Sequence, residues 1–242
     1  MPSRKLLVTD IDGTLVGDPD ATRRLAEVLA ALREHVILAY ATGRTLRQCE
    51  DLAANPHVIQ PDVWVTEVGA AIRYADEGPD EAWRAKMAET WHRETVVQVV
   101  AGWPELTPQS AIADGPFKVP FQIAPHDAAL VLPKLAAQLL EAGTPARLVY
   151  SSQRDLDIIP AAAGKGPAVQ HLARRFGLGL EDVLTCGDSA NDRDMLVLGG
   201  PAVAVANAHA ELTESGLPGT VLRARAGFAD GVVEALRHYG WV

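Results

Sequence analysis

Cysteine, aromatic residues and positive charge are all scarce in this chain of 242 residues. Its two cysteines, Cys49 and Cys186, stand far apart and in no metal-ligand spacing, which indicates free thiols in a reducing compartment. Lysine and arginine number 22 against 31 aspartates and glutamates, a formal net charge of −9. Nucleic acid and anionic membranes need basic patches on their partners, so neither is expected to bind here. An acidic protein that handles an anionic substrate must make its pocket locally positive, with a metal, lysine and arginine.

Long apolar runs are missing as well. The N-terminus leads straight into a strand, and no stretch is long enough for a signal peptide or a membrane-spanning helix. We therefore expect a soluble, cytoplasmic protein, a monomer or small homo-oligomer, whose partner is a small molecule. Hydrophobic residues make up 48% of the chain, and its length suits one domain with an inserted lobe.

Strand and helix patterns alternate at the start of the chain. A strand over 5–9 precedes apolar residues at helical spacing between Leu25 and Leu32, then a strand over 35–41. A helix is expected from Thr45 onward, and a strand over 63–65. This βαβαβ order predicts an α/β fold with a Rossmann-like, doubly wound parallel sheet.

The alternation breaks at a turn-rich segment over 76–80 and returns after Pro160. Between them we expect a separate α+β lobe over 78–160, inserted into a core formed by 1–77 and 161–242. Its predicted elements are a long helical stretch with three tryptophans, a strand over 117–123, a helix over 127–142 interrupted or bent near Pro133, and strands over 146–151 and 156–159 that form a hairpin.

The most informative motif is Asp10-Ile11-Asp12-Gly13-Thr14, directly behind the apolar run Leu6-Leu7-Val8. Side chains at i and i+2 of a strand share a face, so both carboxylates are expected to enter one site at the carboxyl edge of the sheet. Two carboxylates so close repel each other unless a cation or a shared proton relieves them. This predicts Mg²⁺, with one carboxylate as nucleophile. Taken alone, Asp-Gly is also common turn chemistry after a strand.

Three further polar motifs follow strands or open helices. Thr42-Gly43-Arg44 follows the second strand and can bind phosphate oxygens. Gly164-Lys165-Gly166 opens a helix, where the lysine can pair with phosphate and carboxylate. In Gly187-Asp188-Ser189-Ala190-Asn191-Asp192, Asp188 is expected to ligate the metal directly, while Asn191 and Asp192 hold metal-bound waters or orient Lys165. Each motif alone is also typical of caps and solvated loops.

In this order the four motifs resemble those of the haloacid dehalogenase-like (HAD) phosphatase superfamily, in both halves of the split domain. The resemblance implies that Asp10 is the nucleophile and Asp12 the general acid–base. It implies phosphate binding by Thr42, Gly43, Lys165 and Asn191. It also implies Mg²⁺ bound by Asp10, Asp188 and the backbone carbonyl of Asp12, with Asp192 as a further candidate for the metal site.

An α+β lobe between the second and third motifs resembles the cap of sugar-phosphate phosphatases. A closer resemblance is to sucrose-phosphate phosphatases and their relatives acting on mannosylfructose phosphate; it lies in 6–18, 66–74, 117–119, 155–160 and 163–166. The sequence departs from that family at Gly13 and Phe117. The expected substrate is a disaccharide phosphate such as sucrose 6-phosphate, and the candidate substrate-binding residues are Arg44, Lys118, Gln122, Ser152 and Asp157.

Other functions stay open at this point. Mannosylfructose-phosphate or mannosyl-3-phosphoglycerate phosphatases are alternatives, and so is a phosphomutase of the same superfamily. A receiver-like switch phosphorylated on Asp10 would share the acidic strand ends and the lysine. It would lack the inserted lobe and the second acid, Asp12.

Overall fold

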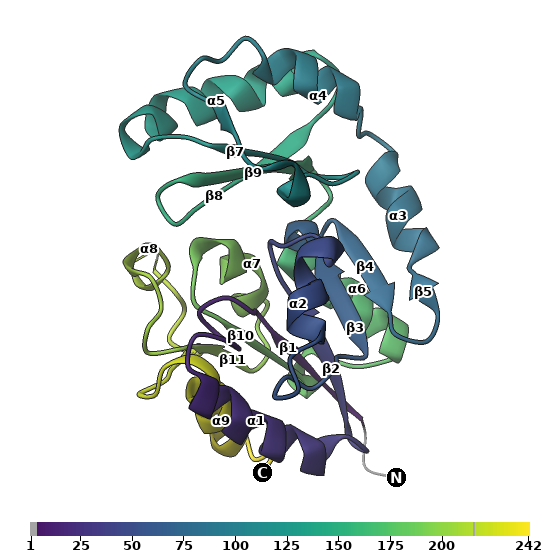
Figure 1. Ribbon diagram of the computed structural model, residues 1–242, viewed down its shortest axis with the longest axis vertical. Coiled ribbons are helices and arrows are strands. Elements are labelled where there is room, and N and C mark those ends of the chain that lie inside the picture. Colours follow the sequence, from purple (N-terminus) through teal and green to yellow (C-terminus); the bar gives the residue numbers. More distant parts are fainter. Residues whose placement is uncertain (1–3, 215) are drawn as a thin grey trace.

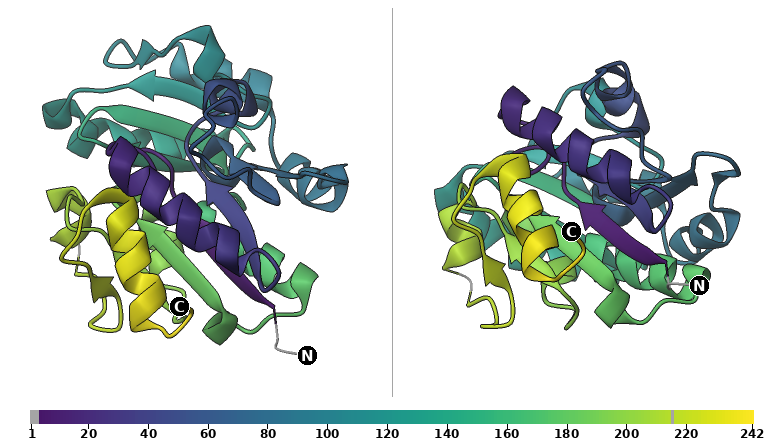
Figure 2. Two further views of the ribbon diagram at one scale, coloured as in Figure 1. Left: turned by 60° about the horizontal axis from the view of Figure 1, so that its bottom comes forward. Right: turned by 90° about the horizontal axis from the view of Figure 1, so that it is seen from below.

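A computed structural model describes residues 4–214 and 216–242. Within them the strands form two separate sheets, a larger one in the lower part of Figure 1 and a smaller one above it. The first and last described residues, 4 and 242, lie at the larger sheet, so the smaller sheet is carried by an internal segment (Figures 1 and 2).

The larger sheet has the order β12-β11-β10-β1-β2-β3-β4-β5 in the described residues. Its strands are β1 (Lys5–Thr9), β2 (Val36–Ala41), β3 (Val63–Thr66), β4 (Ala71–Tyr74), β5 (Gly78–Pro79), β10 (Val183–Gly187), β11 (Ala202–Ala204) and β12 (Leu222–Arg223). Neighbours from β12 to β3 run parallel, whereas β4 and β5 add an antiparallel edge. The expected parallel α/β sheet is confirmed.

Alternate residues of β1 and β2 point to opposite faces of this sheet, as strand geometry requires. One face packs against α1 (Pro19–Leu32) and α9 (Phe228–His238). The other packs against α6 (Lys165–Phe176), α7 (Arg193–Leu196) and α3 (Glu81–Ala88). The shorter helices are η1 (Leu46–Cys49), α2 (Glu50–Ala53), η2 (Glu67–Gly69), η4 (Leu180–Asp182), η5 (Ala190–Asp192) and α8 (Ala210–Thr213).

The smaller sheet has the order β6-β7-β9-β8, and all its described pairings are antiparallel. Its strands are β6 (Thr107–Pro108), β7 (Val119–Gln122), β8 (Ala146–Ser151) and β9 (Asp155–Pro160), and η3 (Ala111–Ala113) lies between β6 and β7. The helices α4 (Arg93–Val100) and α5 (Pro125–Glu141) cover its outer face with an apolar core, so its other face looks toward the larger sheet (Figure 1). This is the expected α+β lobe, which we call the cap.

Three predicted elements differ from the structure. The helix expected from Thr45 is only η1 followed by the single turn of α2. The tryptophan-containing stretch is two helices, α3 and α4. The helix α5 runs through Pro133 without interruption, because Pro133 lies on its exposed side, where water can bind the carbonyl that proline leaves unpaired.

The first elements of the expected lobe pack with the larger sheet. The strand β5 pairs with β4 of the larger sheet, and Trp83 and Met87 of α3 pack into the core of that sheet. We therefore propose that the cap begins after α3 rather than at Gly78. No helix in the described ranges is both long and apolar enough to cross a bilayer.

Candidate active site

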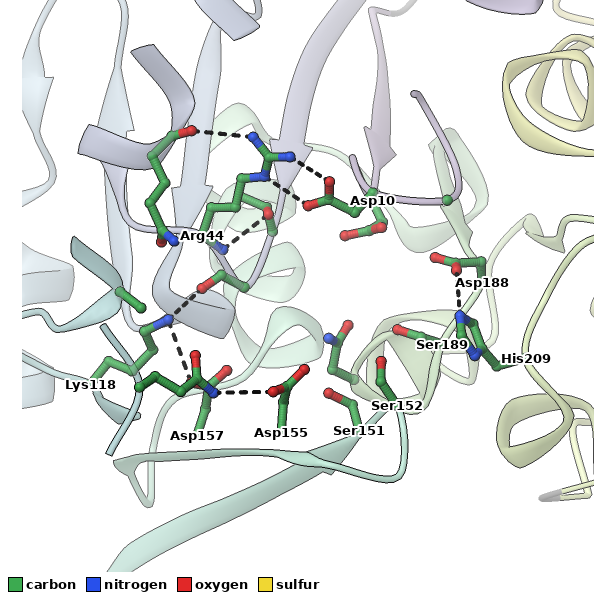
Figure 3. Close-up of a pocket in the computed structure, with 18 residues that line it drawn as sticks. Asp10, Arg44, Lys118, Ser151, Ser152, Asp155, Asp157, Asp188, Ser189 and His209 are labelled. Carbon is green, nitrogen blue, oxygen red and sulfur yellow. Dashed lines mark hydrogen bonds and ion pairs between the residues drawn. The ribbon is translucent and has the colours of Figure 1, made fainter. Parts of the chain in front are cut away.

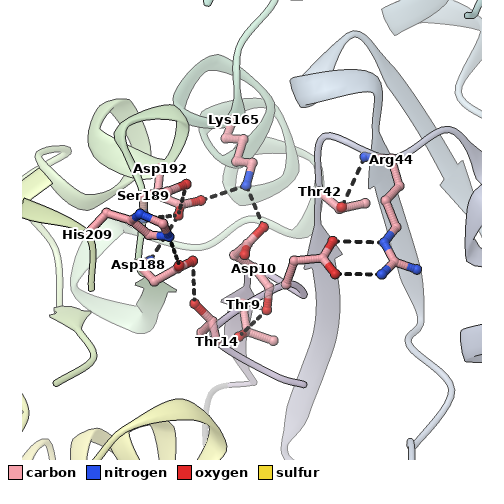
Figure 4. A network of polar contacts seen from close by, with 11 residues as sticks. Thr9, Asp10, Thr14, Thr42, Arg44, Lys165, Asp188, Ser189, Asp192 and His209 are labelled. Atoms are coloured by element: carbon pink, nitrogen blue, oxygen red, sulfur yellow. Dashed lines mark hydrogen bonds and ion pairs between the residues drawn. The ribbon is translucent and has the colours of Figure 1, made fainter. Parts of the chain in front are cut away.

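Polar residues from three strand ends and one helix start meet at the carboxyl edge of the larger sheet (Figure 4). Asp10 follows β1, Thr42 follows β2 and Asp188 follows β10, and these three strands are adjacent. Lys165 opens α6 and reaches the same point. All four side chains are buried. The predicted motifs are thus brought together by neighbouring parallel strands, as in other open α/β sheets.

The ammonium group of Lys165 links two carboxylates. Its Nζ lies 2.6 Å from Oδ1 of Asp10 and 2.6 Å from Oδ1 of Asp192. Lys165 and Asp192 are both completely buried. Burial disfavours the charged lysine, but the two carboxylates outweigh it and raise the pKa of Lys165. A permanent positive charge therefore lies beside the predicted nucleophile.

Asp188 is held by the loop that follows Asp10. The hydroxyl of Thr14 donates a hydrogen bond of 3.1 Å to Oδ1 of Asp188. Gly13 packs directly on the same carboxylate: a Cβ atom there would lie 2.4 Å from Oδ2, and the φ angle of Gly13 is +82°. Only glycine fits this close approach and this conformation.

Oxygen atoms of Asp10, Asp188 and Asp192 lie within 4.8 Å of one another, so this acidic cluster could bind a metal ion. Burial raises the pKa of Asp10 well above its usual range, an effect that Lys165 opposes and the carboxylates of Asp192 and Asp188 reinforce. Burial and the Asp192 charge raise the pKa of Asp188 to about 6. The single positive charge of Lys165 does not balance the negative charges of these carboxylates. A hard divalent cation with oxygen ligands, such as Mg²⁺, fits this donor set.

Asp192 is better suited to positioning than to metal binding. Its Oδ2 accepts hydrogen bonds from the backbone N–H groups of Asp188 and Ser189, both at 3.0 Å. Its Oδ1 is occupied by Lys165. Both oxygens are therefore already used within the protein, and the carboxylate fixes the direction of Lys165.

The side chain of Asp12 does not enter the acidic cluster. The strand β1 ends at Thr9, so Asp12 lies in a turn and the i, i+2 rule for strands no longer applies to it. Its carboxylate, 55% exposed, forms a two-pronged pair with the guanidinium of Arg44, at 2.8 Å from Nε and 2.5 Å from Nη2. Asp10 and Asp12 both line one cavity, but the Asp12 carboxylate is paired with Arg44 rather than with the acidic cluster.

The remaining phosphate-motif residues border a cavity above the acidic cluster. The hydroxyl of Thr42 accepts a hydrogen bond from the backbone N–H of Arg44 at 3.1 Å. The backbone N–H of Thr42 donates to the carbonyl of Val65. The side-chain oxygen of Asn191 is buried and has no hydrogen-bond partner in the described residues. Unpaired buried polar atoms are rare, so Asn191 has capacity for a ligand in the cavity.

The cavity between core and cap has a volume of about 370 Å³ (Figure 3). It is lined from the core by Asp10, Asp12, Gly13, Thr42, Gly43, Arg44, Gln48, Asp188, Ser189, Asn191 and His209, and from the cap by Gln109, Ala113, Lys118, Ser151, Ser152, Asp155 and Asp157. Polar groups therefore face it from both sides, and the acidic cluster lies at its core end.

Lys118 joins the cap to the phosphate loop. Its Nζ donates to the carbonyl of Gly43 at 2.7 Å and lies 3.5 Å from Oδ1 of Asp157. Burial raises the pKa of Asp157, and the nearby positive charge of Lys118 opposes this rise. Of the candidates for substrate binding, Arg44, Lys118, Ser152 and Asp157 line the cavity, whereas Gln122 does not. Gln122 instead donates to Asp155 at 3.4 Å.

Sequence reasoning missed five polar lining residues that lie outside its four motifs: Gln48, Gln109, Ser151, Asp155 and His209. One of them had a usable signal. Asp155 and Asp157 stand two apart on β9, so strand geometry places both on the same face. Ser151 is the last residue of β8 and Gln48 lies in η1, whereas Gln109 and His209 lie in loops, whose direction depends on tertiary contacts.

This fold, with polar motifs at three adjacent strand ends and one helix start, defines a haloacid dehalogenase-like protein. A haloacid dehalogenase-like hydrolase from Bacillus subtilis has the same fold, with a TM-score of 0.71 at 20% identity over 98% of this chain and 92% of that one.

Within that class, the family model described as Sucrose-6F-phosphate phosphohydrolase matches residues 3–240, and the chain belongs to this family. Sucrose-phosphatase 1 of Nicotiana tabacum is 32% identical over 98% of this chain. A mannosylfructose-phosphate phosphatase of Agrobacterium fabrum is 34% identical, covering 99% of this chain and 98% of that protein. The chain spans only 59% of the tobacco relative's length.

A solved structure gives the strongest structural similarity of those described here. The sucrose-phosphatase of Synechocystis sp. PCC6803, crystallised with sucrose and phosphate, has a TM-score of 0.92 to this chain. It is 32% identical, and the match covers 98% of each chain. The cap and the core are therefore arranged alike in the two proteins.

Proposed function

We propose that this protein hydrolyses the phosphate monoester of a disaccharide, with sucrose 6-phosphate as the first candidate. The observation that carries the proposal is the single cavity of about 370 Å³ that joins the Asp10–Lys165 site to the polar inner face of the cap. A bound sugar phosphate needs both ends of this cavity, the core end for its phosphoryl group and the cap end for its sugar. The names of the related sucrose- and mannosylfructose-phosphate phosphatases support the same substrate class.

The chemistry assigned to the core uses five side chains. An Asp10 oxygen attacks phosphorus, the bond from phosphorus to the sugar oxygen breaks, and Asp12 gives that oxygen its proton. Asp12 then takes a proton from water, the water oxygen attacks the aspartyl-phosphate, and inorganic phosphate and free Asp10 are formed. Lys165 neutralises charge on the phosphoryl oxygens during both displacements, and Thr42 and Asn191 orient them.

We propose that Asp10, Asp188 and the backbone carbonyl of Asp12 hold Mg²⁺. The fit rests on the oxygen atoms of Asp10 and Asp188, which lie close together; burial, and after it the neighbouring carboxylates, raise the pKa of both groups. When bound, the ion neutralises charge shared by the nucleophile and the phosphate. The free, buried thiols of Cys49 and Cys186 are consistent with a cytoplasmic location.

The sugar is assigned to the cap face of the cavity. Lys118, Ser151, Ser152, Asp155 and Asp157 all border it, and hydroxyl-rich ligands need such polar groups on a rigid frame. Carboxylates at 155 and 157 can accept hydrogen bonds from sugar hydroxyls. Mannosylfructose phosphate presents the same chemistry and is the second candidate, supported by the 34% identity to the Agrobacterium fabrum enzyme.

A screen of phosphate release tests this proposal. Purified protein with Mg²⁺ is offered sucrose 6-phosphate, mannosylfructose phosphate, mannosyl-3-phosphoglycerate, trehalose 6-phosphate and hexose phosphates. We expect a disaccharide phosphate to have the highest kcat/KM. Isomer formation from a bisphosphorylated hexose, without release of phosphate, would instead identify a phosphomutase. Highest activity on a hexose phosphate would contradict the assigned role of the cap.

A further inference from the structure

One carboxylate of the core contacts the turn that joins β8 to β9 in the cap. The backbone N–H of Ser152 donates a hydrogen bond to Oε1 of Glu211 at 2.9 Å. The same oxygen accepts a second, longer one from the N–H of Ala190 at 3.4 Å. Glu211 does not itself line the cavity. It accepts hydrogen bonds from two segments that do, the β8–β9 turn and the loop between Ser189 and Asn191.

The backbone of Glu211 is fixed firmly to the core. It belongs to α8, whose Leu212 is completely buried beneath it. The residue before α8, His209, donates its N–H to the carbonyl of Asp188 at 2.8 Å. The carboxylate of Glu211 is therefore held at a set position relative to the acidic cluster.

The turn that Glu211 holds is conformationally unusual. Ser152 and Gln153 have φ angles of +55° and +51°, in the left-handed region that residues other than glycine rarely adopt. On either side of the turn, Ser151 pairs with Asp155 in the β8–β9 ladder, and both line the cavity. The position of the turn thus sets where three polar side chains, those of Ser151, Ser152 and Asp155, meet a ligand.

A second contact fixes the other end of β8 to the same side of the core. Arg147 forms an ion pair of 2.9 Å with Asp194 of α7, and it also donates to the carbonyl of Ala163. The turn lies at the opposite end of β8, and there Glu211 supplies a hydrogen-bond contact with the core.

We propose that Glu211 is a positioning residue for sugar recognition: it holds the β8–β9 turn against the Asp188–Asp192 loop, so that sugar-binding and phosphate-binding groups are in register. This inference rests on the proposed function, in which the cap face binds the sugar. The second acceptor bond, to Ala190, links Glu211 to the loop between Ser189 and Asn191. Loss of the Glu211 acceptor oxygen releases the turn. This weakens sugar binding more than it slows the chemistry at Asp10.

Three substitutions separate the acceptor from the charge. Glu211→Gln keeps Oε1 and the side-chain length, Glu211→Asp keeps the charge but draws the oxygen back, and Glu211→Ala removes both. For sucrose 6-phosphate we expect Glu211→Ala and Glu211→Asp to raise KM about tenfold with kcat changed less than about threefold, as for a lost hydrogen bond to a charged acceptor. Glu211→Gln should stay within about threefold of wild type in KM. Glu214→Ala, an exposed glutamate beside the same helix, is the matched control.

Amide hydrogen exchange of the ligand-free protein provides a readout that needs no substrate. Peptides covering 151–154 should exchange faster in Glu211→Ala and Glu211→Asp than in wild type, with Glu211→Gln and Glu214→Ala unchanged. Unchanged exchange in Glu211→Ala, or faster exchange with an unchanged KM, would overturn the inference. A wild-type protein that releases no phosphate from any sugar phosphate would contradict the proposed function instead, so the two failures are distinguishable.

Discussion

Lys165 Nζ and Asp10 Oδ1 lie 2.6 Å apart, with the lysine side chain fully buried and the Asp10 side chain 7% exposed. A charged pair so far from water is costly to form unless it is well compensated. Here Asp192 supplies a second carboxylate for the same ammonium. The arrangement therefore keeps a positive charge beside a carboxylate that can attack phosphorus, in the place where charge develops during phosphoryl transfer.

The first prediction concerns the nucleophile. Asp10→Asn keeps the shape of the side chain and removes the attacking anion, so we expect turnover of every phosphate ester to fall by on the order of 10³ or more. Asp12→Asn should spare formation of the phosphoenzyme more than its hydrolysis when the leaving group is good. Both are measured by phosphate release and by rapid-quench detection of phosphorylated protein. Wild-type turnover in Asp10→Asn would exclude the covalent route.

The second prediction separates the metal ligand from the positioning carboxylate. Activity should vanish in EDTA and return with Mg²⁺. Asp188→Asn should raise the Mg²⁺ concentration needed for half-maximal activity. Asp192→Asn should mainly lower kcat, by about 10- to 100-fold, because a charged hydrogen bond that orients Lys165 is lost. A Mg²⁺ requirement that rises more in Asp192→Asn than in Asp188→Asn would place Asp192 among the metal ligands.

The third prediction concerns the cap. Lys118→Ala and Asp157→Ala should reduce kcat/KM for a disaccharide phosphate far more than for p-nitrophenyl phosphate, because the aryl ester draws mainly on the core site. Each lost hydrogen bond to a sugar hydroxyl should cost about 0.5–1.5 kcal/mol, and more where charge is involved. Lys134→Ala, an exposed lysine of α5, controls for a general effect on the cap. Equal losses on both substrates would mean that these two residues only support the fold.

The fourth prediction concerns stability at the base of the cap. Asp80 caps α3 by accepting from the Trp83 N–H at 2.9 Å, and it also accepts from the Tyr74 hydroxyl and contacts His171 Nε2, both at 2.7 Å. Burial alone would raise the pKa of Asp80, but these hydrogen bonds outweigh it and lower the pKa. Asp80→Asn should reduce the free energy of unfolding by about 1–3 kcal/mol near neutral pH.

The sign of the pH dependence follows from that lowered pKa. The stabilising contribution of Asp80 is complete above its unfolded-state pKa, about 3.9, and is lost as the pH falls through the lower folded-state value. Urea unfolding of wild type and Asp80→Asn should therefore give a constant difference above about pH 5 that shrinks at lower pH. A difference that does not change with pH would contradict the assigned role of the carboxylate.

The sequence was sufficient to predict the sheet and the meeting of the four motifs, because apolar runs and strand-end carboxylates follow local rules. It was not sufficient for Asp12. The rule that residues two apart share a face holds only while the strand continues, and β1 ends before Asp10. The partner of Asp12 is Arg44, which approaches from the next strand and leaves no mark near Asp12 in the sequence.

The cap shows the same limit. Asp157 and Gln122 were both candidates for sugar binding; Asp157 lines the cavity, whereas Gln122 on the neighbouring β7 donates to Asp155. The contact of Glu211 with the β8–β9 turn joins segments far apart in the chain, and neither segment carries a sequence pattern that predicts the contact. Similarly, Trp83 falls by sequence within the expected lobe, yet its side chain packs into the core of the larger sheet.

The most direct test compares two substrates that share one phosphate position. Sucrose 6-phosphate and fructose 6-phosphate are assayed with wild-type protein and Mg²⁺, and kcat/KM is measured for each by phosphate release. Contacts between the extra ring and the cap, at about 0.5–1.5 kcal/mol each, predict a preference for the disaccharide of at least about tenfold. Equal values, or a preference for fructose 6-phosphate, would contradict the claim that the cavity between core and cap is built for a disaccharide phosphate.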